Sequence, residues 1–124
     1  MTNPLYDKLF RSHAKNTKPF LYLSDGRTLA YKDFITSSSK MANALIKLGL
    51  KPGDRLAIQV KKSPEMLTIY AACAQAGIIF LPLNTAYTAN ELLYFIEDSG
   101  ACIFICHKNI SEEVSKKTSH LNIK

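Results

Sequence analysis

From Gly49 onwards, short apolar runs alternate with segments of helical pattern, and this alternation restricts the fold more than any other feature of the sequence. The apolar runs predict strands over residues 56–60, 78–81 and 101–106. Each run is followed by a helical segment, and the connections between them are short. Strands and helices that alternate in this way form right-handed parallel crossovers, so the sequence predicts an α/β fold with a layered parallel sheet.

Residues that favour helix ends mark the first two of these helices. Ser63 and Pro64 predict a side-chain cap followed by a first-turn proline, and the helical body over residues 66–76 is apolar on almost every side. Thr88 and Glu91 have the spacing of a capping box, in which each side chain binds a free backbone amide of the other residue. The first helix is therefore expected to be buried, and the second is expected to begin after Thr88.

The third helix is predicted over residues 111–120. Glu112 and Glu113 at its front and lysines behind them suit the dipole of a surface helix. Residues 121–124 follow at the point where the alternation predicts another strand. We therefore expect the boundary at Lys124 to cut through a domain, because no linker or low-complexity segment precedes it.

The N-terminal part of the sequence predicts a short helix, a hairpin and a longer helix. Asn3 and Pro4 favour the start of the short, amphipathic helix. Asp25 and Gly26 lie between two apolar runs and predict a β-hairpin, which we expect to lie outside the parallel sheet. Helical spacing over residues 31–48 predicts the longer helix. The apolar stripe of the short helix is predicted to comprise Leu5, Leu9, Phe10 and Ala14.

The sequence is basic, with sixteen Lys and Arg residues against ten Asp and Glu residues and a formal net charge of +6. Such a charge is compatible with binding to nucleic acid, to an anionic membrane or to a polyanionic cofactor. The lysines are spread along the chain, however, and the arginines are only Arg11, Arg27 and Arg55. Bidentate recognition of phosphate or guanine favours clustered arginines. We therefore expect a solvated basic surface and no nucleic-acid partner.

The apolar runs and the cysteines indicate in which cellular compartment the protein is expected. No run approaches the roughly 18 residues of a membrane-spanning helix, and the N-terminus lacks the profile of a signal peptide. Cys73, Cys102 and Cys106 are odd in number and include no CxxC pair, which argues against a disulfide framework or a zinc site. We expect three buried, reduced thiols and a cytoplasmic protein.

Side chains that could take part in catalysis or ligand binding are scattered along the sequence rather than clustered. A phosphate-binding loop needs glycines close together, and the five glycines here are isolated, with no GxGxxG or GxxxxGK[ST] pattern. His107 follows a predicted strand, and Lys61, Lys62 and Ser63 precede a predicted helix, which are positions where ligands bind in α/β proteins. Neither position has an identifiable partner, so an ordinary strand-end histidine and solvated lysines are favoured. The sequence therefore predicts no catalytic, cofactor-binding or metal-binding residue.

Four ordered segments resemble motifs of the adenylate-forming acyl-CoA synthetases. Residues 29–34 resemble the first core motif of that superfamily and residues 76–84 the second, while residues 49–58 and 87–92 match the segments that accompany them. Within the superfamily, the sequence Pro-Leu-Asn-Thr-Ala-Tyr-Thr over residues 82–88 is similar to malonyl-CoA synthetases. Medium-chain and aromatic acyl-CoA synthetases share much of this pattern.

The resemblance implies a ligase that activates a carboxylate, with malonate as the best guess, to an acyl-adenylate with Mg-ATP and then transfers the acyl group to coenzyme A. The phosphate loop, the ribose-binding aspartate and the catalytic lysine of the family correspond to positions beyond Lys124. Residues 1–124 are therefore expected to form part of the N-terminal AMP-binding domain, truncated before the phosphate loop. Alone, this part is expected to be inactive and to bind no ATP, Mg or coenzyme A.

Two residues depart from the first core motif. Ala30 stands where the family usually has threonine, which removes a cap oxygen worth on the order of 1 kcal/mol at the start of a helix. Asp33 stands in place of glutamate, so the capping box expected there is weakened twice.

Two further interpretations remain open. The chain is compatible with a stand-alone α/β interaction module without catalytic activity, which would pair its exposed sheet edge with a partner or with a second copy. It is also compatible with a small phosphate-binding protein of flavodoxin-like type, although the first strand lacks the glycine-rich turn that such proteins use.

Overall fold

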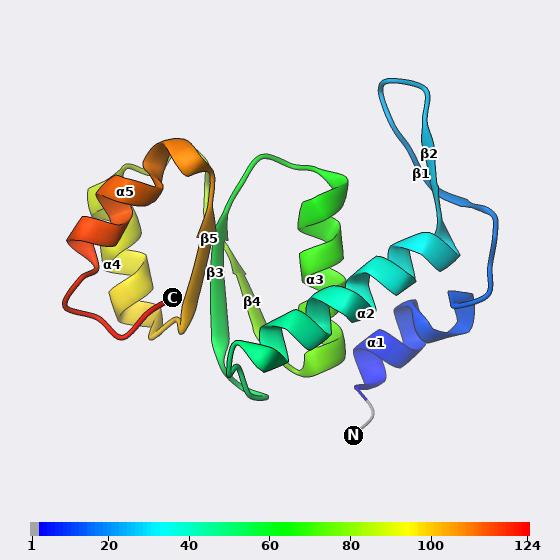
Figure 1. Ribbon diagram of the computed structural model, residues 1–124, viewed down its shortest axis with the longest axis horizontal. Helices are drawn as coiled ribbons and strands as arrows, with labels where there is room; N and C mark the ends of the chain where they lie inside the picture. Colours follow the sequence, from blue (N-terminus) through cyan, green and yellow to red (C-terminus); the bar gives the residue numbers. More distant parts are fainter. Residues whose placement is uncertain (1–2) are drawn as a thin grey trace.

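The computed structural model describes residues 3–124, and its centre is a parallel sheet of three strands in the order β4-β3-β5 (Figure 1). The strands are β3 (Arg55–Gln59), β4 (Ile79–Pro82) and β5 (Ile103–Cys106). Leu56 in the central strand pairs with Phe80 on one side and with Ile103 on the other. The predicted layered parallel sheet is confirmed, and each strand lies within two residues of its predicted bounds.

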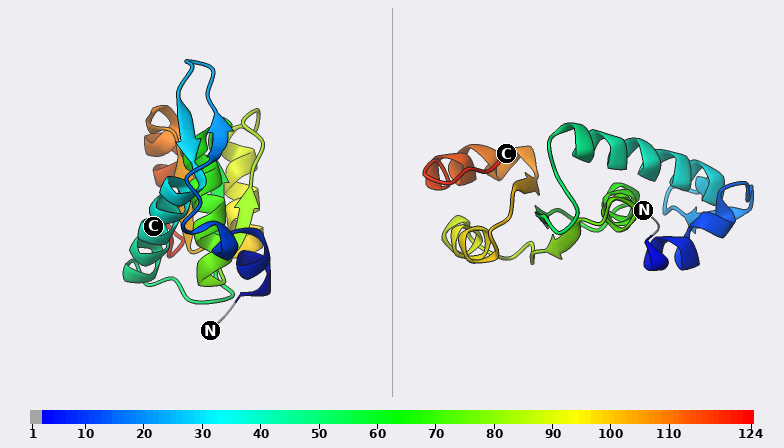
Figure 2. Two further views of the ribbon diagram at one scale, coloured as in Figure 1. Left: turned by 90° about the vertical axis from the view of Figure 1, so that its right-hand side faces the viewer. Right: turned by 90° about the horizontal axis from the view of Figure 1, so that it is seen from below.

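Helices cover both faces of this sheet (Figure 2). Successive side chains of β3 point to opposite faces, so Ile58 packs with Cys73 in the core beside α2 and α3, whereas Ala57 packs with Leu92 beside α4 and α5. None of the helices in the described part of the chain is long and apolar enough to cross a membrane. The four helices are α2 (Tyr31–Lys47), α3 (Pro64–Ala76), α4 (Ala89–Ser99) and α5 (Lys108–Lys117).

The ends of α3 and α4 are fixed by the residues that the sequence indicates. The Ser63 hydroxyl accepts a hydrogen bond from the Met66 amide at 3.2 Å. At the start of α4, the Thr88 hydroxyl accepts from the Glu91 amide at 3.3 Å, and the Glu91 carboxylate accepts from the Thr88 amide at 2.7 Å. Gly77 ends α3 in the left-handed region with φ of 73°, which a residue with a side chain rarely adopts. The predicted caps are confirmed.

The first turn of α2 has no side-chain cap, as expected from Ala30 at its N-cap position. The preceding chain supplies other acceptors. The Tyr31 amide donates to the Lys18 carbonyl at 3.1 Å, and the Lys32 amide donates to the Asn16 carbonyl at 2.9 Å. Because two of the free amides are satisfied in this way, the missing cap costs less than the roughly 1 kcal/mol that the sequence suggests.

The N-terminal helix and the hairpin are present, and the hairpin forms its own two-stranded antiparallel sheet apart from the parallel one, as predicted. Asn3 caps the helix by accepting the Leu5 amide at 3.0 Å. These elements are α1 (Pro4–Leu9), the short 3-10 helix η1 (Arg11–His13), β1 (Pro19–Tyr22) and β2 (Thr28–Ala30).

The predicted apolar stripe of α1 is wrong. Leu5 and Leu9 are 49% and 44% exposed, and Ala14 is exposed too, whereas Tyr6 is only 5% exposed and its ring packs against Phe10. The reason is that α1 turns the face of Tyr6 to the rest of the chain, where the Tyr6 ring packs against Phe10 and Phe10 packs against Phe34. Leu5 and Leu9 lie one turn apart on another face of the same helix, and Ala14 follows the end of η1.

The predicted position of α5 is also wrong, by three residues at each end. The helix begins at Lys108, because β5 ends at Cys106 and His107 already has the extended backbone of an N-cap. Glu112 therefore lies in the middle of the helix, where it pairs with Lys116 at 3.0 Å, rather than at the positive end of the dipole. The lysines do lie in the last turn, as predicted.

The three cysteines are free thiols, but only one of them is fully buried. Cys73 lies in the core against the sheet, and burial raises its pKa to about 12. Burial also raises the pKa of Cys106, which is half-buried like Cys102. The expectation of buried thiols thus holds for Cys73 and only in part for the other two.

Candidate functional site

The carboxyl ends of β3, β4 and β5 meet at one edge of the sheet, the upper edge in Figure 1, and α/β proteins commonly bind ligands at this edge. The segments that leave the strands here contribute Lys61 after β3, Asn84 after β4 and His107 after β5. The parallel sheet thus brings together residues that are far apart in the sequence. The hydrogen bonds at this edge show which groups are used to hold the chain in place.

Gln59, the last residue of β3, holds the segment that follows β4. Its side chain is only 4% exposed, and its amide group donates to the Asn84 carbonyl at 2.8 Å and to the Tyr87 carbonyl at 3.1 Å. The Asn84 side chain in turn accepts from the Ala86 amide at 2.9 Å. These bonds fix the path of the chain into the Thr88 cap of α4. Gln59 is not among the residues predicted from the sequence, although a lone polar residue in an apolar strand is a signal for a buried hydrogen-bonding role.

His107 joins the exits of two strands. Its Nε2 accepts a hydrogen bond from the Lys61 amide at 3.1 Å, so this nitrogen carries no proton in the bonded state. The imidazole therefore ties the end of β5 to the end of β3. This contact gives the strand-end histidine a structural role, in line with the interpretation favoured from the sequence.

The two lysines after β3 line a hollow of about 620 Å³ between the exits of β3 and β4. Lys61 and Lys62 are exposed, and the neighbouring Ser63 hydroxyl is already used as the cap of α3. Apolar and polar residues share the wall of this hollow. Its wall includes Val60, Lys61, Lys62, Met66, Pro82 and Thr85.

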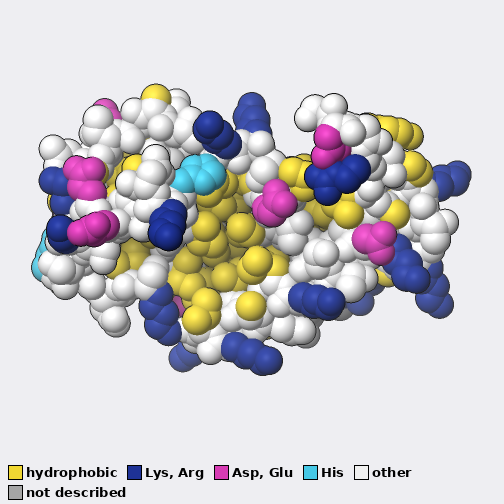
Figure 3. All heavy atoms as spheres, turned by 45° about the horizontal axis from the view of Figure 1, so that its top comes forward, with side chains coloured by type: hydrophobic (Ala, Val, Ile, Leu, Met, Phe, Trp, Pro, Cys, Tyr) yellow, Lys and Arg dark blue, Asp and Glu magenta, His cyan; other side chains and the backbone are white. Residues whose placement is uncertain are grey.

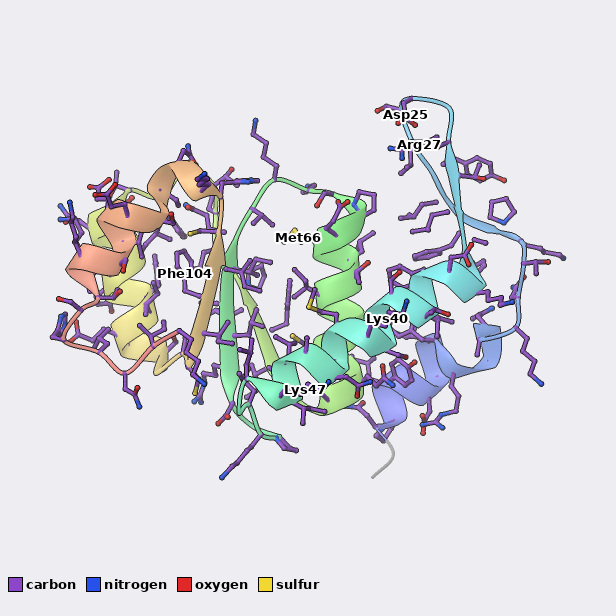
Figure 4. The ribbon with its side chains drawn as sticks, viewed as in Figure 1. Asp25, Arg27, Lys40, Lys47, Met66 and Phe104 are labelled. Atoms are coloured by element: carbon purple, nitrogen blue, oxygen red, sulfur yellow. The ribbon has the colours of Figure 1, made fainter. Side chains whose placement is uncertain are left out.

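Hydrophobic side chains also gather in a broad hollow on the face shown in Figure 3, with Lys and Arg side chains spaced around its rim. Met66 is central to this apolar surface, because it lines the hollow beside the strand exits, a second one beside the hairpin and a third beside Tyr70 and Phe80. Figure 4 shows Met66 projecting from α3 toward the sheet. Part of the core on this side is thus open to solvent.

The side chains of Gln59 and His107 at this edge bind backbone groups of neighbouring segments. Within residues 3–124, no three His, Cys, Asp or Glu side chains lie close enough together to hold a metal ion. The glycine-rich loop that would wrap a triphosphate does not occur in the sequence. The hydrogen bonds described at this edge are made to backbone groups, and no reaction step is assigned to its residues.

A parallel sheet covered by helices on both faces, with a preceding helix and hairpin, makes the chain an α/β protein. The sequence profile of the family described as AMP-binding enzyme matches residues 10–124. The chain therefore belongs to the AMP-binding enzyme family. Its structure is that of the N-terminal portion of an adenylate-forming acyl-CoA synthetase.

Solved structures of MatB from Rhodopseudomonas palustris are similar to the whole of this chain. The apo and ATP-bound forms superpose with TM-scores of 0.92 and 0.93, at 33% sequence identity, over 100% of this chain and 25% of MatB. Among curated proteins, the fatty acid–acyl-carrier-protein ligase ScoC of Streptomyces coeruleorubidus is 34% identical over 86% of this chain and 20% of its own length. The acetyl-coenzyme A synthetase of Mycobacterium tuberculosis is 41% identical over 67% of this chain and 13% of its own. The chain thus spans a quarter or less of these relatives.

Proposed function

We propose that residues 1–124 form the N-terminal portion of an acid–CoA ligase. Such an enzyme joins a carboxylate to the α-phosphate of ATP, which gives an acyl-adenylate and pyrophosphate. It then transfers the acyl group to the thiol of coenzyme A and releases AMP. The observation that carries this proposal is the match to ATP-bound MatB, which extends over 100% of the chain at 33% identity. Malonate is the acid we propose, because residues 82–88 resemble the corresponding segment of malonyl-CoA synthetases.

In the proposed ligase, residues 1–124 have a structural role. Gln59, through its bonds to the segment after β4, and the capping box of Thr88 and Glu91 hold one strand exit in place. ATP, Mg²⁺ and coenzyme A are cofactors of the whole ligase. Because the described residues offer neither a phosphate loop nor a cluster of metal ligands, we propose that the chain alone is inactive.

A cytoplasmic location is part of the same proposal. It is supported by the three free cysteines, because reduced thiols persist in that compartment. The substrates of the proposed ligase are small molecules, and nucleic acid is not among its partners.

A hybrid enzyme tests the proposal. Residues 1–124 would replace the matching N-terminal segment of Rhodopseudomonas palustris MatB, and malonyl-CoA formation from malonate, ATP and coenzyme A would be followed by chromatography. The hybrid is expected to retain activity, because the exchanged segment has the same fold and carries no reacting group. Parallel assays with acetate and with a fatty acid show whether the exchange alters the choice of acid.

The isolated chain serves as the second arm of this experiment. We expect no acid-dependent exchange between ATP and pyrophosphate above a control without protein. Exchange by the isolated chain would contradict its proposed inactivity, and a folded hybrid without activity would contradict its proposed place in a ligase. Circular dichroism of the hybrid separates loss of function from loss of fold.

A further inference from the structure

We propose that α1 docks on the surface of an anionic lipid membrane, with its exposed leucines among the lipids and the neighbouring lysines against the lipid phosphates. Leu5, Lys8, Leu9 and Lys15 together form what we term the α1 surface. The inference concerns attachment to a membrane surface, not a membrane span, and it does not depend on the proposed function.

One face of α1 presents two leucines and a lysine to water. Leu5, Lys8 and Leu9 are spaced by three and four residues, so their side chains lie on the same side of the helix. Leu5 is 49% exposed, Leu9 is 44% exposed, and Lys8 is exposed too. The helices α3 and α4 each have one large apolar residue exposed to this degree, Leu67 and Tyr94. The helix α1 therefore carries a pair of apolar side chains where α3 and α4 expose isolated ones.

The opposite face of α1 fixes this orientation. Tyr6 is buried, its ring lies 5.7 Å from that of Phe10, and the Phe10 ring lies 5.8 Å from that of Phe34. Phe34 is 1% exposed in α2, so this row of aromatic rings holds α1 to the core. A rotation of α1 that buried the leucines would remove Tyr6 from its packing. The exposure of the leucines is therefore a fixed feature of the fold.

Basic side chains accompany the two leucines. Residues 3–18 contain four basic side chains and a single carboxylate, and this carboxylate, Asp7, pairs with Arg11 at 2.5 Å. The ion pairs in the described part of the chain include none of the other three basic residues, which are Lys8, Lys15 and Lys18. Their ammonium groups can therefore interact with the phosphates of anionic lipids.

The segment that carries Lys15 is held close to the end of η1. The Asn16 amide donates to the His13 carbonyl at 2.9 Å, and the Asn16 carbonyl accepts from the Lys32 amide at 2.9 Å. The His13 ring also stacks on Tyr31, with 4.5 Å between the ring centroids. Lys15 follows η1 by two residues, so its backbone is tied to the start of α2 together with this segment.

A lipid bilayer fits the α1 surface better than a protein partner does. A stable protein interface buries about 800 Å² on each partner, far more than a helix of 6 residues offers. A symmetric pair of chains would bring the lysines of both copies together, and like charges oppose such a contact. A bilayer supplies apolar chains for the leucines and phosphates for the lysines without a matching pocket.

Docking through α1 leaves the strand exits free. In Figure 1, α1 lies at the lower right, whereas the carboxyl ends of the strands form the upper edge of the sheet. The side of the molecule that faces the membrane is therefore not the side of the candidate site.

Vesicle binding by residues 1–124 tests the contribution of the leucines. Sedimentation with sucrose-loaded vesicles of phosphatidylglycerol and phosphatidylcholine in equal parts gives the partition coefficient, and phosphatidylcholine vesicles are the reference. Leu5→Ser with Leu9→Ser is expected to lower the partition coefficient by at least about tenfold. Ile46→Ser with Tyr94→Ser is the matched control, because these residues are 54% and 63% exposed on other helices, and it should change the coefficient by less than about threefold.

A second pair of variants tests the lysines. Lys8→Gln with Lys15→Gln is expected to weaken binding to the anionic vesicles by about twentyfold at low ionic strength, and less at high salt. Lys40→Gln with Lys47→Gln lowers the net charge equally, but on α2, as Figure 4 shows. This control is expected to weaken binding by less than about threefold, because α2 does not lie at the membrane.

Fluorescence measures insertion of the leucine positions directly. The chain contains no tryptophan, so Leu9→Trp introduces a single fluorophore. Its emission is expected to shift to shorter wavelength on the anionic vesicles, whereas the emission of Tyr94→Trp is expected to stay unchanged. The MatB hybrid carries the same α1 surface and is a second host for all these variants, with unaltered MatB as its reference.

Three outcomes would overturn the inference. The first is binding to anionic vesicles that is no stronger than binding to phosphatidylcholine alone. The second is equal binding by each double variant and its control. The third is a homodimer of the chain, seen by light scattering, that the change of both leucines dissociates. None of these readouts involves ATP or an acid, so the inference and the proposed function fail separately.

Discussion

The two halves of the chain differ in how closely the structure follows local sequence signals. In residues 50–124 the helix ends at Ser63, Thr88 and Gly77 lie where the residue types predict them, and four of the five residues of β3 are buried. In residues 3–49 the buried face of α1 departs from the predicted pattern, because α1 buries Tyr6 and leaves Leu5 and Leu9 exposed. Around the parallel sheet, α3 and α4 thus follow local sequence signals, whereas the buried face of α1 is set by its contacts with the rest of the chain.

The largest expected effect comes from a pair of Leu→Ala changes, one in each half. Leu56 is 0% exposed in the central strand, so Leu56→Ala is expected to lower the free energy of unfolding by about 2–5 kcal/mol through the cavity it leaves. Leu9→Ala, at a residue that is 44% exposed, should change it by less than about 0.5 kcal/mol. Urea denaturation measures both. Similar losses of unfolding free energy at the two positions would contradict the difference between the two halves.

The next largest effect is expected at the carboxyl edge of the sheet. Gln59→Leu removes the donor to the Asn84 and Tyr87 carbonyls, and leaving these acceptors without it should cost about 1–3 kcal/mol. Gln75→Leu is the matched control, because Gln75 accepts only one bond, from Ser39 at 3.2 Å, in a half-buried setting. Equal destabilisation by the two changes would show that Gln59 does not hold the segment after β4.

Much of the fold follows from the sequence, and the parts that do not have physical reasons. Strand runs and caps are local signals, so α3, α4 and the parallel sheet could be predicted. The start of α5 at Lys108 depends on where β5 ends, which pairing with β3 decides. The bonds of Gln59 join residues 25 and 28 positions apart, and the bond of His107 to Lys61 spans 46 positions. Such partners are set by the order of the strands, which a single sequence does not specify.

Loss of a side-chain cap in the sheet half is expected to have a moderate effect. Thr88→Ala removes one side of the capping box with Glu91 and should lower the free energy of unfolding by about 1 kcal/mol. Thr88→Ser keeps the hydroxyl and is the control. A loss as large for serine as for alanine would mean that the methyl group, rather than the cap, stabilises α4.

The smallest effect is expected from adding a cap in the N-terminal half. Ala30→Thr supplies the missing oxygen at the start of α2 and should raise the free energy of unfolding by a few tenths of a kcal/mol, less than Thr88→Ala removes. The gain is small because the amides of Tyr31 and Lys32 already donate to the carbonyls of Lys18 and Asn16. A gain of about 1 kcal/mol or more in urea denaturation would contradict this account of the first turn.

The central claim, that this chain is the scaffold portion of an acid-activating ligase, is tested most directly by malonate-dependent exchange between ATP and pyrophosphate in the MatB hybrid. We predict exchange within about tenfold of unaltered MatB, a difference of roughly 1.4 kcal/mol in the barrier. A hybrid that is folded by circular dichroism and shows no exchange above the control without malonate would contradict the claim.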